Sequence, residues 1–282
     1  MTHSKTFPPA LRLLLNPLAA PAACWHHRGL LRRLVARELE ARYRGSIFGI
    51  LWSILNPIIL LTVYTFVFTV VFKAKWGEAG MGSNHHFALL LFAGLLVYNL
   101  FAESVARAPG IMLSQVTYIK KVVFPLEILP IVPVFAACVT ALISLALLLV
   151  AVIALDGDAY AIMALAPLTL LPALLLNLGV CWFLASVGVY FRDLQQLVGV
   201  FIMVLMFMSP VFYPISSLPE VMRPYLASNP IAISIEQLRG VVFMGTWHSP
   251  ASFALLGLGC WLVAHLGYCW FSLTKRGFAD VC

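Results

Sequence analysis

Charged residues are scarce in this sequence. Only 10% of its 282 residues are Asp, Glu, Lys or Arg, whereas 62% are hydrophobic. A soluble domain carries about a quarter charged residues, which it needs to cover a water-facing surface. The composition therefore excludes a soluble globular domain and indicates an integral membrane protein. The net charge of +7 then reports on membrane topology, and we expect no nucleic-acid partner.

The residue patterns of several catalytic and metal sites are also missing. The six cysteines form no CxxC pair and mostly lie within apolar runs, so neither a disulfide framework nor a metal site is expected. No GxxxxGK[ST] phosphate loop occurs, so we expect no cofactor in this chain, with ATP and Mg²⁺ on a partner. The pairs His85-His86 and Asp156/Asp158 lack the spacing of metal ligands or of a nucleophile with its base. An integral membrane enzyme of envelope-lipid or glycan metabolism stays an alternative, without catalytic residues that we can name.

Long apolar runs predict six membrane-spanning helices. A crossing takes about 20 mostly apolar residues, and the acidic turn 156–158 separates the third span from the fourth. Residues 1–27 form a tail, 28–44 a basic segment, and 45–282 the membrane domain. The fold expected is thus an all-α membrane protein. The predicted spans are 47–72, 87–106, 127–154, 161–189, 196–213 and 251–273.

The basic residues predict the orientation of the spans. With the N-terminus inside, fourteen of the 18 Lys and Arg residues lie on the cytoplasmic side. The remaining four lie outside; they are Lys73, Lys75, Arg223 and Arg239. The opposite orientation would invert this ratio, so we expect both termini in the cytoplasm.

The basic segment before the first span has the pattern of an amphipathic helix on the inner membrane face. Arg33, Arg37 and Arg44 fall on one arc of the helical wheel, and leucines and a valine occupy the opposite arc. Arg32 and Arg42 lie near the apolar arc, from which their long stems can reach headgroups or a partner. A plain topological signal, without any partner, is the alternative interpretation.

Prolines interrupt two of the predicted spans. Asn56-Pro57 predicts a kink in the first span, and Pro210 and Pro214 should bend or break the fifth. Broken backbone at membrane depth requires cover by protein or a water-filled cavity. The moderately apolar segment 214–248 then predicts short re-entrant or interfacial helices before the last span.

A few polar side chains have expected structural roles. Asn99 and Asn177 lie within predicted spans and should form hydrogen bonds between helices. Arg192 and Asp193 lie in the turn between the fourth and fifth spans, where Asp193 would favour the start of a helix. A turn that only follows the charge rule is the alternative.

Four stretches of the chain form a specific combination of motifs. They are RELEARYRGSIFGILWSILNPIILLTVYTFVFTVVFK (37–73), YIKKVVFPLEILP (118–130), VYFRDLQQLVGVF (189–201) and SPVFYPISSLPE (209–220). Together they resemble permeases of the type-2 ABC exporter family, in the polysaccharide-export branch. The motif RYRGS–LW–LNP is more similar to the O-antigen permeases of this branch than to its capsule permeases. Teichoic-acid permeases belong to the same branch. A lipid- or drug-exporting permease of the same family is a further alternative.

The resemblance implies an assembly in the bacterial inner membrane. It implies a homodimer, bound to two copies of a separate ABC ATPase and surrounded by membrane lipids. A polyprenyl-linked polysaccharide would pass along a path at the dimer interface, lined by spans 1 and 5. The amphipathic helix and the loop between spans 2 and 3 would face the ATPase. This loop is longer than the about 2–8 residues that a plain connection needs.

These implications select two sets of candidate residues. Aromatic rings can stack on the apolar faces of sugars without gripping any one sugar, which suits a sliding polymer; lipid-facing aromatics are the alternative. For the loop between spans 2 and 3, the alternative to contact with the ATPase is binding to anionic lipid only. The candidate path residues are Phe48, Trp52, Tyr64, Phe68, Phe72, Phe201, Phe212 and Tyr213. The candidate coupling residues are Arg33, Arg37, Arg44, Gln115, Tyr118, Ile119, Lys120 and Lys121.

Overall fold

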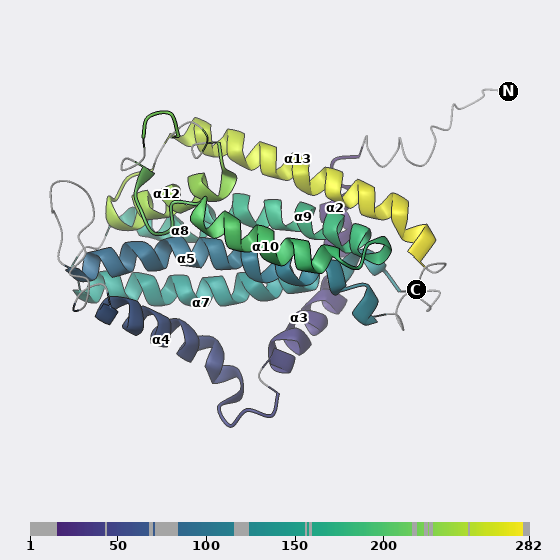
Figure 1. Cartoon of the computed structure of the whole chain (residues 1–282), viewed down its shortest axis with the longest axis horizontal. Helices are drawn as coiled ribbons and strands as arrows, with labels where there is room; N and C mark the ends of the chain where they lie inside the picture. Colours follow the sequence, from purple (N-terminus) through teal and green to yellow (C-terminus); the bar gives the residue numbers. More distant parts are fainter. Residues whose placement is uncertain are drawn as a thin grey trace.

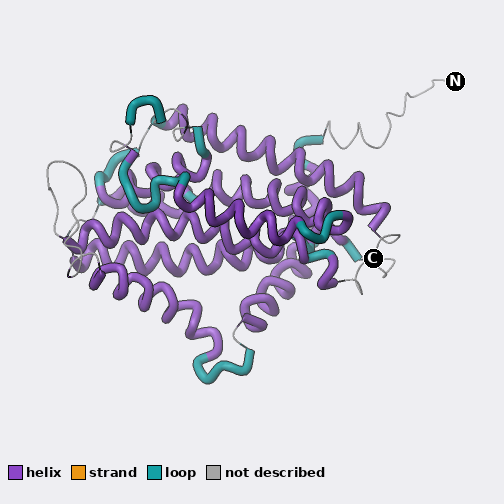
Figure 2. The backbone as a smooth tube through the Cα atoms, viewed as in Figure 1, coloured by secondary structure: helices purple, strands orange, loops and turns teal. Residues whose placement is uncertain are grey.

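The protein is an elongated bundle of helices (Figure 1). In the described residues of this computed structural model, helices are joined by turns and loops, without any strand (Figure 2). This confirms the all-helical prediction for that part of the chain. The structure describes residues 16–42, 44–67, 70, 84–115, 124–155, 157, 160–215, 219–222, 225, 228–247 and 249–278.

The longer helices run side by side, and α3 leans against one end of the bundle (Figure 1). Short 3-10 turns connect several of them. In chain order the α-helices are α2 (Ala19–His26), α3 (Arg28–Arg42), α4 (Trp52–Phe66), α5 (Asn84–Arg107), α7 (Ile131–Leu155), α8 (Ala166–Thr169), α9 (Leu171–Tyr190), α10 (Leu194–Phe207), α12 (Pro230–Phe243) and α13 (Pro250–Thr274). The 3-10 turns are η1 (Gly49–Leu51), η3 (Ala108–Gly110), η4 (Leu113–Gln115), η5 (Leu126–Ile128), η6 (Ala161–Leu165) and η8 (Lys275–Gly277).

Among the residues that the structure describes, four helical segments are long and apolar enough to cross a membrane. They contain α5, α7, α9 and α13, and they match the predicted second, third, fourth and sixth spans to within a few residues. Their length and composition confirm these four predictions. The segments are His86–Gly110, Leu126–Leu155, Ala161–Tyr190 and Pro250–Gly277.

The helices of the predicted first and fifth spans are shorter. α4 reaches Phe66 in the described residues, and positions 68, 69 and 71–83 lie outside the description. α10 ends at Phe207, six residues before the predicted limit of the fifth span, so the span is broken near Pro210 as its prolines predict. The cause is Pro210, which cannot continue a helix and disfavours helical backbone in the residue before it. Fourteen residues rise only about 21 Å, short of the ~30 Å hydrocarbon core.

Helix α5 forms the centre of the bundle. Most of its side chains from Ala88 to Phe101 are buried, where it packs against α4, α7, α9, α10 and α12. A helix that is apolar on all sides is expected in such a position. Asn177 of α9 donates a hydrogen bond from Nδ2 to the Leu100 carbonyl at 2.9 Å. This confirms the prediction that Asn177 joins two helices.

Helices α9 and α13 form the most extensive helix pair of the fold. They approach so closely that a Cβ atom added to Gly267 would lie 2.2 Å from the Gly179 carbonyl oxygen. A Cβ atom added to Gly179 would lie 2.4 Å from the Val263 carbonyl oxygen. Small residues permit this kind of close backbone contact between membrane helices.

Candidate functional site

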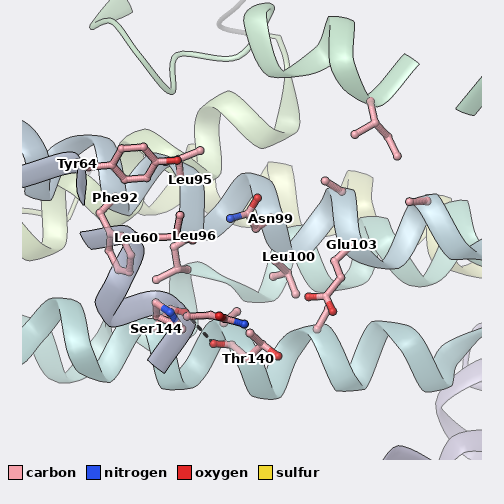
Figure 3. Close-up of a pocket in the computed structure, with 17 residues that line it drawn as sticks. Leu60, Tyr64, Phe92, Leu95, Leu96, Asn99, Leu100, Glu103, Thr140 and Ser144 are labelled. Atoms are coloured by element: carbon pink, nitrogen blue, oxygen red, sulfur yellow. Dashed lines mark hydrogen bonds between the residues drawn. The ribbon is translucent and has the colours of Figure 1, made fainter. Parts of the chain in front are cut away.

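A cavity of about 460 Å³ lies between α4, α5 and α7, with Ile202 of α10 at its edge. We call it the first cavity. Figure 3 shows Tyr64 near one end and Glu103 near the other, with leucines between them. The predicted kink residues Asn56 and Pro57 belong to the same lining. The first cavity thus brings together three residues that the sequence singled out in span 1.

The first cavity has polar atoms at several depths of an otherwise apolar lining. The Thr140 and Ser144 hydroxyls donate to carbonyls one turn earlier in α7, at 3.3 and 3.0 Å. Both hydroxyl oxygens can still accept a hydrogen bond from a ligand. Asn99, predicted to join helices, is instead exposed to this cavity. The lining therefore suits an amphiphilic ligand with hydroxyl groups.

At one end of the bundle, α3 buries Leu31 and Leu34 in a cluster with residues of α7 and η5. Arg33, Arg37 and Arg44 are exposed. This is the division of faces that the helical wheel predicts. Of the other candidate coupling residues, Gln115 is half-buried in η4. Tyr118, Ile119, Lys120 and Lys121 lie outside the described residues.

Charged side chains join the helices at this same end. Arg42 forms an ion pair with Glu103, and Arg107 forms one with Glu38, so both connect α3 to α5. Arg42 therefore points into the protein rather than to headgroups. Lys275 Nζ of η8 lies 3.0 Å from Glu127 Oε2 of η5. The ion pairs hold four elements, α3, α5, η5 and η8, together at this end of the bundle.

The candidate aromatic residues do not share one surface. Phe48 and Trp52 pack edge to face with ring centroids 6.0 Å apart, and the Trp52 indole N–H donates to Ser46 at 2.7 Å. Tyr64 lines the first cavity. Phe68 and Phe72 lie outside the described residues.

The aromatic residues of the fifth span also separate. Phe201 lines a second, apolar cavity of about 500 Å³ between α5, α9, α10 and α12. Phe212 packs on the core and on Phe207, with ring centroids 6.1 Å apart. The Tyr213 hydroxyl donates to the Phe207 carbonyl at 2.8 Å, which satisfies an acceptor at the end of α10. Phe212 and Tyr213 thus have structural contacts at the break in the span.

The turn between α9 and α10 holds Arg192 and Asp193, both exposed. Asp193 occupies the position before the first residue of α10, and its carbonyl accepts from the Gln196 and Leu197 amides at 3.0 and 3.2 Å. Its carboxylate makes no capping hydrogen bond. Asp193 is therefore at the helix start, where its charge meets the positive end of the helix dipole.

Sequence reasoning missed the role of Arg239. We counted it among the outer charges, but it is only 2% exposed and lies within α12. Its guanidinium donates to the carbonyls of Leu90, Pro210 and Val211 at 2.7 to 3.1 Å, and pairs with Glu236 at 3.1 Å. The sequence does contain an indication of this role. An Arg follows a Glu by three residues in an apolar segment, and this segment comes after a span that prolines break.

This arginine explains how the break in the fifth span is tolerated. The carbonyls of Pro210 and Val211 follow α10 and have no helical partner, so a buried donor must satisfy them. Arg239 supplies that donor and at the same time ties α12 to α5 at Leu90. Within 214–248 the described residues include helix α12, a 3-10 position at Ile215 and a helical position at Tyr225, so the prediction of short helices in this segment stays a prediction.

Comparisons with known proteins identify the family of this chain. Residues 29–243 match the family model described as ABC-2 type transporter. The chain is 33% identical over 221 residues to the O-antigen export system permease protein RfbA of Myxococcus xanthus, covering 78% of this chain and 82% of that protein. It is 25% identical over 254 residues to a Klebsiella pneumoniae protein of the same name, covering 89% and 94%. It is also 25% identical over 217 residues to the polysialic acid transport protein KpsM of Escherichia coli, covering 75% and 80%. These relatives are named for transport rather than for catalysis, and the chain belongs to the ABC-2 type transporter family.

Proposed function

We propose that this chain is the membrane permease of an ABC exporter for a lipid-linked polysaccharide, with O-antigen as its first candidate. The observation that carries the proposal is the 33% identity to an O-antigen export permease over 82% of that protein's length. The match to a polysialic acid transport protein favours a polysaccharide over a drug or a simple lipid as the substrate. The substrate would move from the cytoplasm across the bacterial inner membrane.

The energy source would be a separate ATPase subunit. The chain itself has no GxxxxGK[ST] phosphate loop. Helix α3 and the η3–η4 segment lie at the end of the bundle where the ion pairs gather. The exposed arginines of α3 support docking of an acidic partner surface there. The charge rule supports a cytoplasmic position for this end and for both termini.

A homodimer with two ATPase copies is part of the same proposal. Large apolar side chains of α4 and α10 are exposed, among them Ile59, Val63, Met203 and Phe207. Such faces need either lipid or a second copy as cover. A shared interface at α4 and α10 would put Tyr64 and Phe201 near a path between two protomers.

The function is tested by purifying the chain with its ATPase and measuring transfer of a lipid-linked polysaccharide. We expect transfer that depends on ATP and on both proteins. If the isolated chain modified a lipid-linked sugar without ATP, the membrane-enzyme alternative would replace the proposal. Transfer of drugs or phospholipid alone would favour the third alternative.

The role of the aromatic residues has its own test. Replacing Tyr64 and Phe201 together by Ala should lower polysaccharide export while ATP hydrolysis and assembly persist, since sugar-stacking surfaces are lost. Phe183→Ala is the matched control, because Phe183 is exposed elsewhere, beside Trp270 between α9 and α13. Export at the wild-type level in a well-expressed double variant would remove the aromatic path from the proposal.

A further inference from the structure

Helix α3 touches the wall of the first cavity through charged side chains. An Arg42 Nη1–Glu103 Oε1 contact and an Arg107 Nη1–Glu38 Oε1 contact join α3 to α5. Glu103 also lines the first cavity. One residue therefore belongs both to the cavity and to the contact with the surface helix. We call these two ion pairs the α3–α5 joint.

The joint defines one register between the helices. On α3 a Glu precedes an Arg by four residues, and α5 repeats this order, so each helix presents an acid and a base on one face. The helices meet in antiparallel order, since Arg42 pairs with Glu103 and Glu38 with Arg107. Sliding α3 by one turn would put either the two acids or the two bases opposite each other. The joint therefore favours a discrete position of α3 over a continuum.

Burial makes the Arg42–Glu103 pair of the joint a poor device for stability alone, whereas the Arg107–Glu38 pair is more exposed. The Arg42 side chain is 10% exposed and that of Glu103 is 27% exposed. The Nε and Nη2 atoms of Arg42 are buried without a hydrogen-bond partner among the described residues. A buried pair with unsatisfied donors recovers little of its desolvation cost. What such a pair does provide is a strong and specific attraction between two elements in a poorly solvated place.

The same surface helix is connected to the opposite wall of the cavity through the chain. Residues 44–51 lead from α3 to α4, and they contain Gly45 at φ 85° and Gly49 at φ 49°. Among the described residues, nothing lies within 4 Å of a Cβ atom built on either glycine. Helix α3 therefore reaches α4 by an open, glycine-containing segment and α5 by the joint, while its apolar face packs on α7.

We infer that the α3–α5 joint transmits movement of α3 to the inner end of the first cavity and sets its width there. The inference rests on the proposed function, in which α3 faces the ATPase. Arg42, Glu103, Glu38 and Arg107 are then positioning residues, which act on the cavity wall without needing to touch the polymer. Separation of the pairs would let α3 move without α5, so ATP would be hydrolysed without a matching change in the cavity.

The test uses the full permease–ATPase complex and measures polysaccharide exported per ATP hydrolysed. Arg42→Met/Glu103→Gln removes both charges and so leaves no buried unpaired ion, which protects folding. Arg42→Glu/Glu103→Arg reverses the pair. Glu220→Gln is the matched control, because Glu220 is an exposed carboxylate far along the chain after the break in the fifth span. We expect the neutral double variant to lose about tenfold in export per ATP, the size of typical coupling between contacting residues, with hydrolysis retained.

The reversed variant should regain most of that loss, which a merely structural role of either side chain would not produce. If it does not assemble, Glu38→Arg/Arg107→Glu provides the same test at the second pair. Wild-type export per ATP in the neutral variant, or a reversed variant that assembles and is no better than the neutral one, would overturn the inference. Failure of the wild-type complex to transfer any polysaccharide would instead refute the proposed function.

Discussion

At the scale of single residues, the buried guanidinium of Arg239 makes the clearest prediction. Arg239→Met removes the donor that serves the Leu90, Pro210 and Val211 carbonyls while keeping an apolar stem. The Leu90 carbonyl still accepts within α5, but the buried Pro210 and Val211 carbonyls are left without a partner, so we expect a loss of about 3 kcal/mol or more in stability. The midpoint of thermal unfolding in detergent measures it. The control is Arg276→Met at an exposed site, which should change stability by no more than ~0.5 kcal/mol. Equal midpoints for both variants would contradict the role of Arg239.

Two polar residues illustrate what the sequence can and cannot predict at this scale. A side-chain amide in the middle of an apolar span needs a hydrogen-bond partner, and a backbone carbonyl on a neighbouring helix is nearly always within reach. The interhelical hydrogen bond of Asn177 could therefore be predicted from the sequence. Arg239 sits in a segment that is short for a span, where the charge rule assigned it to a loop. Its burial depends on carbonyls freed by a proline break 29 residues earlier. Only the tertiary arrangement brings that break to α12.

At the scale of helices, the α9–α13 crossing offers a matched pair of substitutions. Gly267→Ala would place a methyl group against the Gly179 backbone, whereas Gly257→Ala adds one on the same helix where nothing lies within 4 Å. We expect Gly267→Ala to cost about 2–3 kcal/mol, because backbone atoms cannot move aside as flexible side chains do. Gly257→Ala should be neutral or slightly stabilising, since Ala favours the helix. Similar thermal midpoints for the two variants would show that the helices can separate at little cost.

The length of the apolar runs predicted the limits of the unbroken, span-length helices. It was less accurate for the predicted span that is broken. Helices α5, α7 and α13 end close to their predicted limits, because each is bounded by a charge, a proline or a polar turn. For α10 the apolar run continues past the helix end at Phe207, so hydropathy alone overestimates its length. The prolines carried the missing information. Hydropathy also could not indicate that α12 would be buried on nearly every side.

At the scale of the whole molecule, the charged residues at the α3 end of the bundle have two different roles. Some remain exposed, as the topology rule expects, and Arg33 is an example. Others, such as Arg42, form ion pairs with acids on neighbouring elements. A charge count cannot separate these uses, because it ignores which helix lies beside which. The prediction of the candidate path residues has the same weakness. The spacing of aromatic residues along one helix does not reveal that Tyr64 and Phe201 line different cavities.

Orientation is a whole-molecule prediction that labelling of cysteines can test. Val221→Cys, at a 78% exposed position after the fifth span, should react with a membrane-impermeant maleimide in intact cells. Arg276→Cys, near the C-terminus, should react only after the membrane is permeabilised. The unmodified chain is the background control. Burial raises the pKa of its Cys24 thiol to about 11, and the thiolate is the reactive form. Cys24 should therefore label slowly near pH 7 and faster as the pH rises toward 11, and then only after permeabilisation. Labelling of Arg276→Cys in intact cells would reverse the orientation and, with it, the side on which α3 could meet an ATPase.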